Sequence, residues 1–229
     1  MNILSQVYDE ILGDEEGTNL YADFINKHRI KGSLLECACG SGDLLALLSQ
    51  SDDNVTGIDL DEQIIQVAKE KYNLNIRHQN MLNLEGLSQY KTIICVGDSI
   101  NYLGSIDEVE IFFSEVFSHL EDDGVFIFDI HHLDRLEEFK EEYLEEGFFS
   151  LGEYQWSILS VEQQLYHQFV FFIDDNVYIE NVIQNVYEPQ LITNLLISFD
   201  MTFDVYTDFS RKGIHDGEKL FFIVRRQKR

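Results

Sequence analysis

The chain has 229 residues, of which 45% are hydrophobic and 25% charged, and its formal net charge is −26 at pH 7. This length and apolar content exclude a disordered chain and predict a globular protein with one sizeable core. The negative charge repels nucleic-acid phosphates and anionic membranes, so it favours a small-molecule or protein substrate over nucleic acid. Composition leaves the oligomeric state open between a monomer and a homodimer.

No segment approaches the roughly 20 consecutive apolar residues that cross a membrane. The N-terminus is acidic and lacks the basic and apolar segments of a signal peptide, so we expect a cytoplasmic protein. Three cysteines, Cys37, Cys39 and Cys95, lie in apolar runs, and a reducing compartment suits an odd number of buried thiols. A structural zinc needs about four converging ligands, and no second pair lies near Cys37 and Cys39, so we expect no metal site.

The first 130 residues predict helices followed by a parallel sheet. Residues 1–30 carry apolar side chains at helical spacing. From residue 33 to 130, short apolar runs alternate with amphipathic segments, which is typical of a sheet wound with helices on both faces. The expected strands are SLLECA, NVTGIDL, LNIRHQ, KTIICVG and GVFIFDI, and the expected helices between them are DLLALLSQ, DEQIIQVAKEKY and DEVEIFFSEVFSHL.

The pattern changes after Gly147. Residues 147–187 are rich in aromatic and β-branched side chains, and a turn is expected at residues 174–176, so we predict an antiparallel insertion of three or four strands. The preceding acidic run, residues 137–146, reads as the solvated face of a helix. Pro189 should begin a helix, and two closing strands, MTFDVYT and KLFFIVRR, should follow it.

The chain is therefore expected to form one α/β domain, residues 1–229, with the insertion inside it. Ligands of open α/β sheets lie beyond the carboxyl ends of the strands, and the insertion leaves from that end. We expect it to act as a lid. Some of its aromatic side chains should pack on the core and others should line a ligand cavity. The aromatic residues considered are Phe149, Tyr154, Trp156, Tyr166 and Phe169.

The sharpest motif is ECACGSGD, residues 36–43, between the first expected strand and a helix. Its glycines permit a tight turn and close approach of a ligand to the backbone. Asp59 ends the second strand, where a carboxylate can accept both hydroxyls of a ribose. The pair fits either NAD or S-adenosylmethionine (SAM). Leu45 stands where a dinucleotide site has its third glycine, and Glu36 would repel a pyrophosphate, so SAM is favoured.

These segments resemble the class I SAM-dependent methyltransferases, whose core is a Rossmann-like seven-stranded sheet. LLECACGSGDLL is similar to their first motif, VTGIDLDEQII to the second, RHQNMLNL to the third and YKTIICVGDSINYL to the fourth. The aromatic insertion and the closing EKLFFIVRR resemble a small bacterial subgroup, the YqeM-like proteins. Asn80 departs from the pattern, since the family often has aspartate there. The resemblance implies that SAM is bound by Tyr8, Glu36, Gly40, Gly42, Asp59, Leu60, Asn80, Met81, Gly97, Asp98 and Ser99.

Methyl transfer from a sulfonium depends mainly on alignment of donor and acceptor, so an obvious catalytic dyad is not required. If the acceptor must lose a proton, the candidates for a base are Asp98, His131 and Tyr166. The expected function is methyl transfer to a small-molecule acceptor. Two alternatives remain at this stage: a SAM-binding protein without catalysis, and an NAD-dependent oxidoreductase.

Overall fold

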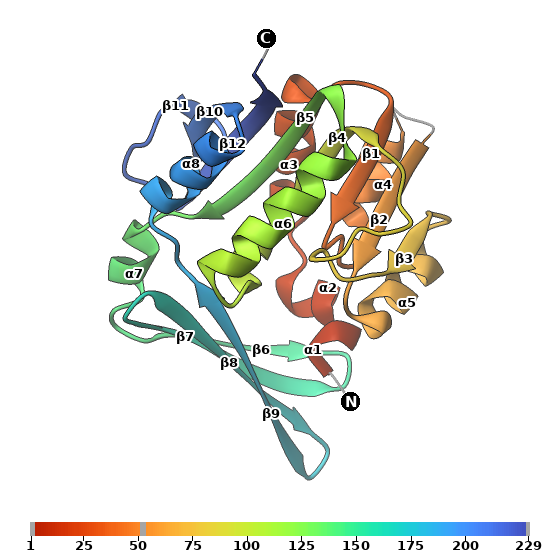
Figure 1. The fold of residues 1–229 in the computed structure, drawn as a ribbon. Coiled ribbons are helices and arrows are strands. Elements are labelled where there is room, and N and C mark those ends of the chain that lie inside the picture. The colour runs from red at the N-terminus through yellow and green to blue at the C-terminus, as the bar shows by residue number, and fades with distance from the viewer. Residues whose placement is uncertain (1–2, 51–53, 228–229) are drawn as a thin grey trace.

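A computed structural model describes residues 3–50 and 54–227 of the chain. Its larger sheet has eight strands in the order β11-β10-β12-β5-β4-β1-β2-β3 (Figure 1). The pairs among β1 to β5 are parallel, whereas β12 runs antiparallel to both β5 and β10. Strand β11 lies at one edge of the sheet and has only two residues. The strands are β1 Ser33–Cys37, β2 Asn54–Asp59, β3 Ile76–His78, β4 Tyr90–Cys95, β5 Leu120–His131, β10 Met201–Thr207, β11 Arg211–Lys212 and β12 Lys219–Arg226.

Helices cover both faces of this sheet, as the alternating pattern predicts. On one face, α3 (Glu15–His28), α4 (Asp43–Ser49) and α5 (Glu62–Lys71) enclose one apolar core. On the other, α6 (Ile106–His119) and α8 (Pro189–Ser198) enclose a second core rich in phenylalanine. The helix starts follow from local chemistry: the Ser105 side chain accepts a hydrogen bond from the Glu108 N–H at the start of α6. Proline in the first turn begins α8.

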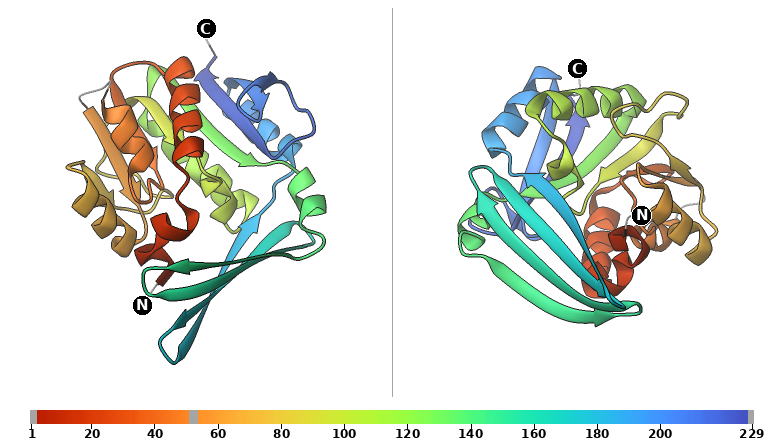
Figure 2. Two further views of the ribbon diagram at one scale, coloured as in Figure 1. Left: turned by 180° about the vertical axis from the view of Figure 1, so that it is seen from behind. Right: turned by 90° about the horizontal axis from the view of Figure 1, so that it is seen from below.

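The insertion forms a separate four-stranded antiparallel sheet in the order β6-β7-β8-β9. It lies beyond the carboxyl ends of the core strands, beside α1 (Ile3–Gln6) (Figures 1 and 2). Its strands are β6 Tyr143–Phe149, β7 Gly152–Val161, β8 Gln164–Ile173 and β9 Asn176–Asn185. The sheet therefore starts before Gly147.

The expectation of a helix across residues 137–146 is wrong for most of that run. Helix α7 (Asp134–Glu138) ends early, and Glu145 and Glu146 lie on β6. The reason is that β6 is an edge strand, where charged side chains stay solvated. Glu145 also accepts hydrogen bonds from the hydroxyls of Tyr143 and Tyr154, at 2.9 and 2.8 Å.

The two faces of the insertion differ in what they contact. Tyr154, Phe169 and Phe171 are buried on the inner face, where they pack with Ile3 and Val7 of the N-terminal segment. Tyr166 alternates to the outer face and is 39% exposed. In the described part of the chain, no helix is long and apolar enough to span a membrane.

Candidate functional site

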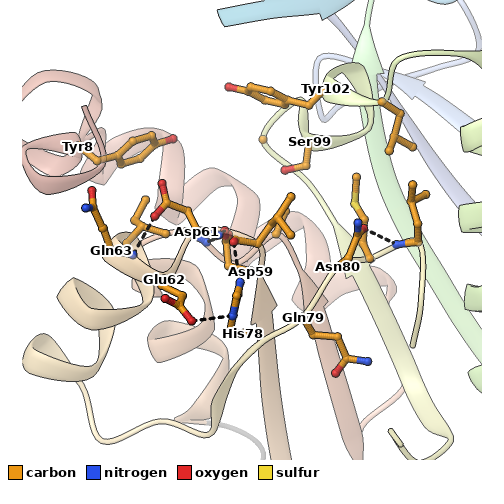
Figure 3. A pocket seen from close by; sticks show the side chains of 18 of the residues that line it. Tyr8, Asp59, Asp61, Glu62, Gln63, His78, Gln79, Asn80, Ser99 and Tyr102 are labelled. Carbon is orange, nitrogen blue, oxygen red and sulfur yellow. Dashed lines mark hydrogen bonds and ion pairs between the residues drawn. The ribbon is translucent and has the colours of Figure 1, made fainter. Parts of the chain in front are cut away.

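A cavity of about 970 Å³ lies at the carboxyl ends of β1, β2 and β4. Its wall is formed by the loops after these strands, by the start of α5 and by α2 (Tyr8–Leu12) (Figure 3). This size is at the upper end of the range for small-molecule sites. The lining residues are Tyr8, Ala38, Gly40, Asp59, Leu60, Asp61, Glu62, Gln63, Ile64, His78, Gln79, Asn80, Met81, Leu82, Gly97, Ser99, Tyr102, Leu103 and Glu108.

In the glycine loop after β1, one glycine lines the cavity and the other packs against the core. Gly40 lines the cavity with φ at 52°. Gly42, with φ at 80°, precedes α4 and faces away from the cavity, because a Cβ there would lie 3.4 Å from both Ala68 and Ile76. Glycine adopts such left-handed backbone angles without the strain that a Cβ adds. Gly42 therefore shapes the turn and its packing rather than touching a ligand.

Asp59 ends β2 with both carboxylate oxygens in defined positions. Oδ2 accepts a hydrogen bond from the Gly40 N–H, and Oδ1 accepts one from the Asp61 N–H, each at 2.9 Å. A carboxylate has about four acceptor positions, so each oxygen can accept one further hydrogen bond. Burial raises the pKa of Asp59, although these backbone hydrogen bonds oppose the shift. The geometry suits a pair of neighbouring hydroxyls.

Glu36 is a buried carboxyl below the glycine loop. It is 4% exposed, and its Oε2 has no hydrogen-bond partner among the described residues. Burial raises the pKa of Glu36 well above its usual range, and the nearby carboxylates of Asp59 and Asp43 add to the shift. A buried polar atom without a partner requires an explanation, and a cationic ligand would supply one.

The loop after β3 forms the wall next to Asp59. Met81 is half-buried, and Leu60 is 64% exposed at the opposite side. The Asn80 Oδ1 accepts a hydrogen bond from the Leu82 N–H at 2.9 Å, so this side chain stabilises its own turn. Motif matching missed His78, whose Nδ1 lies 2.9 Å from Glu62 Oε1.

The loop after β4 forms the far end of the cavity. Gly97 has φ at 76°, and a Cβ built there meets no atom within 4 Å, so it faces open space. Ser99 begins the short helix η1 (Ser99–Tyr102) and donates its hydroxyl to the Val96 carbonyl at 2.8 Å. Tyr8 and Tyr102 point toward each other from opposite walls (Figure 3).

Asp98, between Gly97 and Ser99, belongs to a buried cluster of charged side chains. The sequence motifs indicate Asp98 but not its ion-pair partner Lys219. Oδ2 of Asp98 pairs with the Lys219 ammonium, which also lies 3.6 Å from Asp129. Burial opposes ionisation of Asp98, but Lys219 and then His131 outweigh it and lower its pKa. Lys219 lies at the start of β12, 121 residues from Asp98, so no local motif could reveal the pair.

The N-terminal segment joins the insertion to the core and thereby places Tyr8. The Glu180 carboxylate on β9 accepts hydrogen bonds from the N–H groups of Ile3 and Leu4, at 2.6 and 3.2 Å. Asp9 pairs with Lys71 of α5 at 2.6 Å. These contacts hold the wall that carries Tyr8 against both layers.

Most of the residues implied by the resemblance meet at this cavity. Glu36, Gly42 and Asp98 lie behind its wall, whereas the others line it; the lining set is Tyr8, Gly40, Asp59, Leu60, Asn80, Met81, Gly97 and Ser99. His131 is 4% exposed at the end of β5. Tyr166 lies on the outer face of the insertion, where its hydroxyl donates to Gln164 at 2.7 Å, and it does not line the cavity.

None of the described residues that line the cavity belongs to the insertion. The insertion instead approaches the site through its neighbours. Its aromatic inner face packs on the N-terminal segment, and Asn101 of η1 donates to the Asn185 carbonyl at 2.6 Å.

Comparison with known proteins identifies the class. Residues 34–124 match the family described as a methyltransferase domain. The chain is 28% identical over 207 residues to a Geobacillus sp. strain WCH70 protein, covering 84% of each. It is 33% identical over 106 residues to the "Putative methyltransferase YqeM" of Bacillus subtilis strain 168, covering 44% of this chain and 43% of that one. The Geobacillus protein is likewise named a "Putative methyltransferase". Residues 34–124 therefore form a methyltransferase domain of the class I SAM-dependent type.

Solved structures of other methyltransferases have the same fold as this chain. A SAM-dependent methyltransferase from Clostridium acetobutylicum ATCC 824 has a TM-score of 0.84 at 22% identity, covering 99% of both chains. SAM-bound CalS10, an amino pentose methyltransferase from Micromonospora echinaspora, has a TM-score of 0.76 at 13% identity, covering 98% of this chain and 97% of that one. The predicted Rossmann-like sheet with an antiparallel insertion is confirmed. SAM is the cofactor of this class.

Proposed function

We propose that this methyltransferase binds SAM in the 970 Å³ cavity and transfers the methyl group to a small molecule that carries an amine. The observation that supports it most is the joint placement of Asp59, Glu36 and Gly97. In this arrangement Asp59 accepts the ribose hydroxyls, and the open space at Gly97 receives the methionine end. Glu36 gains a cationic partner for its buried oxygen, directly or through water.

The remaining residues complete the binding site in this proposal. Leu60 and Met81 enclose the adenine, with the Met81 backbone N–H available to read its edge. Ser99 and Tyr8 contact the methionine end. When bound, SAM supplies a methyl group already activated by a sulfonium leaving group, and the protein aligns the acceptor and excludes water.

The charge of the cavity supports an amine as acceptor. The described lining residues include no lysine or arginine, whereas they include four carboxylates. Such a wall attracts a cationic ammonium and repels carboxylates and phosphates. The name of CalS10, an amino pentose methyltransferase of the same fold, points to the same acceptor chemistry. The four carboxylates are Asp59, Asp61, Glu62 and Glu108.

We propose further that the insertion, residues 143–185, acts as a lid over the acceptor side through its contacts with the N-terminal segment and η1. Residues 1–229 are then one domain with this insertion as part of it.

The test combines calorimetry with a transfer assay. SAM and S-adenosylhomocysteine (SAH) should bind with micromolar or tighter affinity, and NAD should not bind. Tritium from methyl-labelled SAM should pass to members of a panel of amino sugars and other small amines, and not to the corresponding alcohols. Binding of NAD without SAM, or transfer to the alcohols alone, would overturn the proposal.

A further inference from the structure

A chain of hydrogen bonds runs from the insertion to His131, whose ring faces Asp98. The Trp156 indole N–H donates to Nδ1 of His167 at 3.3 Å. Nε2 of His167 and Nε2 of His131 each lie 2.9 Å from Oε1 of Gln184. Trp156, His167 and Gln184 lie on β7, β8 and β9, whereas His131 ends β5 of the core sheet. The insertion therefore contacts the core through polar groups as well as apolar ones.

The chemistry of these groups determines where their protons are. An indole nitrogen only donates, so Nδ1 of His167 is an acceptor and its proton must be on Nε2. Nε2 of His167 then donates to Gln184, which must present its oxygen. Because the same oxygen faces His131, Nε2 of His131 carries a proton as well. Burial lowers the pKa of His167 to about 4, which agrees with a neutral ring.

This arrangement leaves Nδ1 of His131 facing Asp98. Nδ1 lies 3.4 Å from Asp98 Oδ1, and both atoms are buried without a hydrogen-bond partner among the described residues. Without a proton between them, two lone pairs would face each other. The other oxygen of Asp98 is held by Lys219. The Asp98–His131 pair is thus built to take up one proton between Oδ1 and Nδ1.

Asp98 connects this pair to the cavity. Its two chain neighbours, Gly97 and Ser99, both line the cavity, and its own side chain is 18% exposed. Burial raises the pKa of the Tyr8 hydroxyl, and the nearby charge of Asp98 raises it further. Asp98 thus lies directly behind the cavity wall with its Oδ1 buried against His131, and His131 can act on a molecule in the cavity only through Asp98.

We propose that the Asp98–His131 pair takes the proton that an amine acceptor must lose, with Gln184 of the insertion holding His131 in the tautomer that accepts it. This inference rests on the proposed function. The N–H bond of the bound ammonium breaks, its electron pair stays on nitrogen, and the proton passes by Asp98 Oδ1 to Nδ1 of His131. The freed lone pair forms the bond to the methyl carbon, and the electrons of the carbon–sulfur bond remain on sulfur. One positive charge ends on His131 and one on the methylated amine.

Several charged groups around His131 determine how readily its ring accepts a proton in this step. Asp98, from the loop after β4, favours the imidazolium. Burial opposes it most strongly, Lys219 of β12 and Arg135 of α7 add to this effect, and together they lower the pKa of His131. The remaining neighbours are His167 and Gln184 on the insertion and Asp129 on β5, which also faces Lys219. His131 is therefore neutral and ready to accept before the acceptor binds.

The direct experiment is nitrogen-15 NMR of labelled histidine in the SAH complex between pH 6 and 9, with His131 assigned from a His131→Asn variant. We expect a neutral ring with its proton on Nε2. A Gln184→Leu variant should lose this tautomer preference, while Gln168→Leu, on the exposed outer face of the same strand pair, should keep it. An imidazolium throughout this range, or a neutral ring protonated on Nδ1 in the wild type, would overturn the inference.

The kinetic experiment uses methyl-labelled SAM and an amine that the wild-type protein methylates in the panel of amino sugars and small amines. His131→Asn should lower kcat about 100-fold or more at pH 7 and leave SAM affinity unchanged. The rate should recover as pH rises toward the pKa of the free amine. Failure of the wild type to bind SAM would contradict the proposed function, on which the inference rests. Transfer at the wild-type rate and with the wild-type pH profile in His131→Asn would contradict only the inference.

Discussion

The Asp59 carboxylate accepts a hydrogen bond from the Gly40 N–H at 2.9 Å, so the end of β2 holds the loop that follows β1. The same carboxylate accepts the Asp61 N–H at the start of α5. One side chain thus fixes two parts of the cavity wall before any ligand binds. Its replacement should therefore affect both cofactor affinity and stability.

Asp59→Ala should weaken SAM binding about 10- to 100-fold, because hydrogen bonds to a charged group contribute about 1.5–3 kcal/mol. It should also lower the Tm of the ligand-free protein by about 2–4 °C for each kcal/mol lost with the two backbone contacts. Asp59→Asn, which keeps one acceptor oxygen, should show a smaller fall in Tm. Calorimetry and thermal unfolding measure the two effects. Asp175→Ala, in an exposed turn of the insertion, is the control. An unchanged SAM affinity in Asp59→Ala would remove this residue from the binding site.

Gly97 and Gly86 offer a matched pair of glycines. Their φ angles are 76° and 83°, and a Cβ at either position meets no atom within 4 Å. Only Gly97 lines the cavity. Alanine should cost about 1–2 kcal/mol of folding free energy at either site because of its left-handed backbone. SAM affinity should fall only in Gly97→Ala, where the methyl group occupies space meant for the cofactor. Equal SAM affinities for the two variants would show that the cofactor lies elsewhere.

Glu36 should link cofactor binding to pH. Burial raises its pKa, so the ligand-free protein holds a neutral carboxyl at pH values where the unfolded chain is ionised. A cationic ligand favours the carboxylate, so binding releases a proton. SAM affinity should rise with pH, by up to about tenfold per pH unit below the raised pKa, and then level off. Calorimetry in buffers of different ionisation enthalpy detects the released proton. Glu36→Gln should bind SAM more weakly and without this slope.

The same residue predicts an opposite trend for folding. Because its folded pKa is raised, Glu36 favours folding fully below the unfolded pKa, and this contribution is lost as pH rises through the folded pKa. Glu36→Gln cannot ionise. Its ligand-free Tm should therefore exceed that of the wild type by a margin that grows between pH 5 and 8. A margin independent of pH would mean that the carboxyl ionises normally in the folded protein.

The sequence predicted the glycine loop and Asp59 because each depends on a short local pattern, an apolar strand followed by glycine or by an acidic residue. It could not predict which face of the insertion meets the core. A shift of one residue exchanges the two faces of a strand, so Tyr154 and Tyr166 are equivalent in sequence. Likewise, His131 and Gln184 are 53 residues apart and meet only because the insertion docks on the core. The lid proposal depends on this docking as well.

Glu180 provides the last prediction, since it holds the N-terminal segment on the insertion. The first N–H groups of a helix have no partner within the helix, and a carboxylate at that end is favourable. Glu180→Ala removes the acceptor for Ile3 and Leu4. Residues 3–12 should then exchange their amide hydrogens faster. SAM should dissociate faster too, because Tyr8 belongs to the cavity wall.

Hydrogen exchange by mass spectrometry and stopped-flow release of SAM measure these two effects of Glu180→Ala. Glu153→Ala is the matched control, because Glu153 is an exposed glutamate on the outer face of the same sheet and should change neither rate. Glu180→Gln retains one acceptor oxygen and should lie between the two. If residues 3–12 exchange at the wild-type rate in Glu180→Ala, the apolar contacts of Ile3 and Val7 with Phe169 and Phe171 hold the segment by themselves. Mutations that open the cavity would then have to be sought among those side chains.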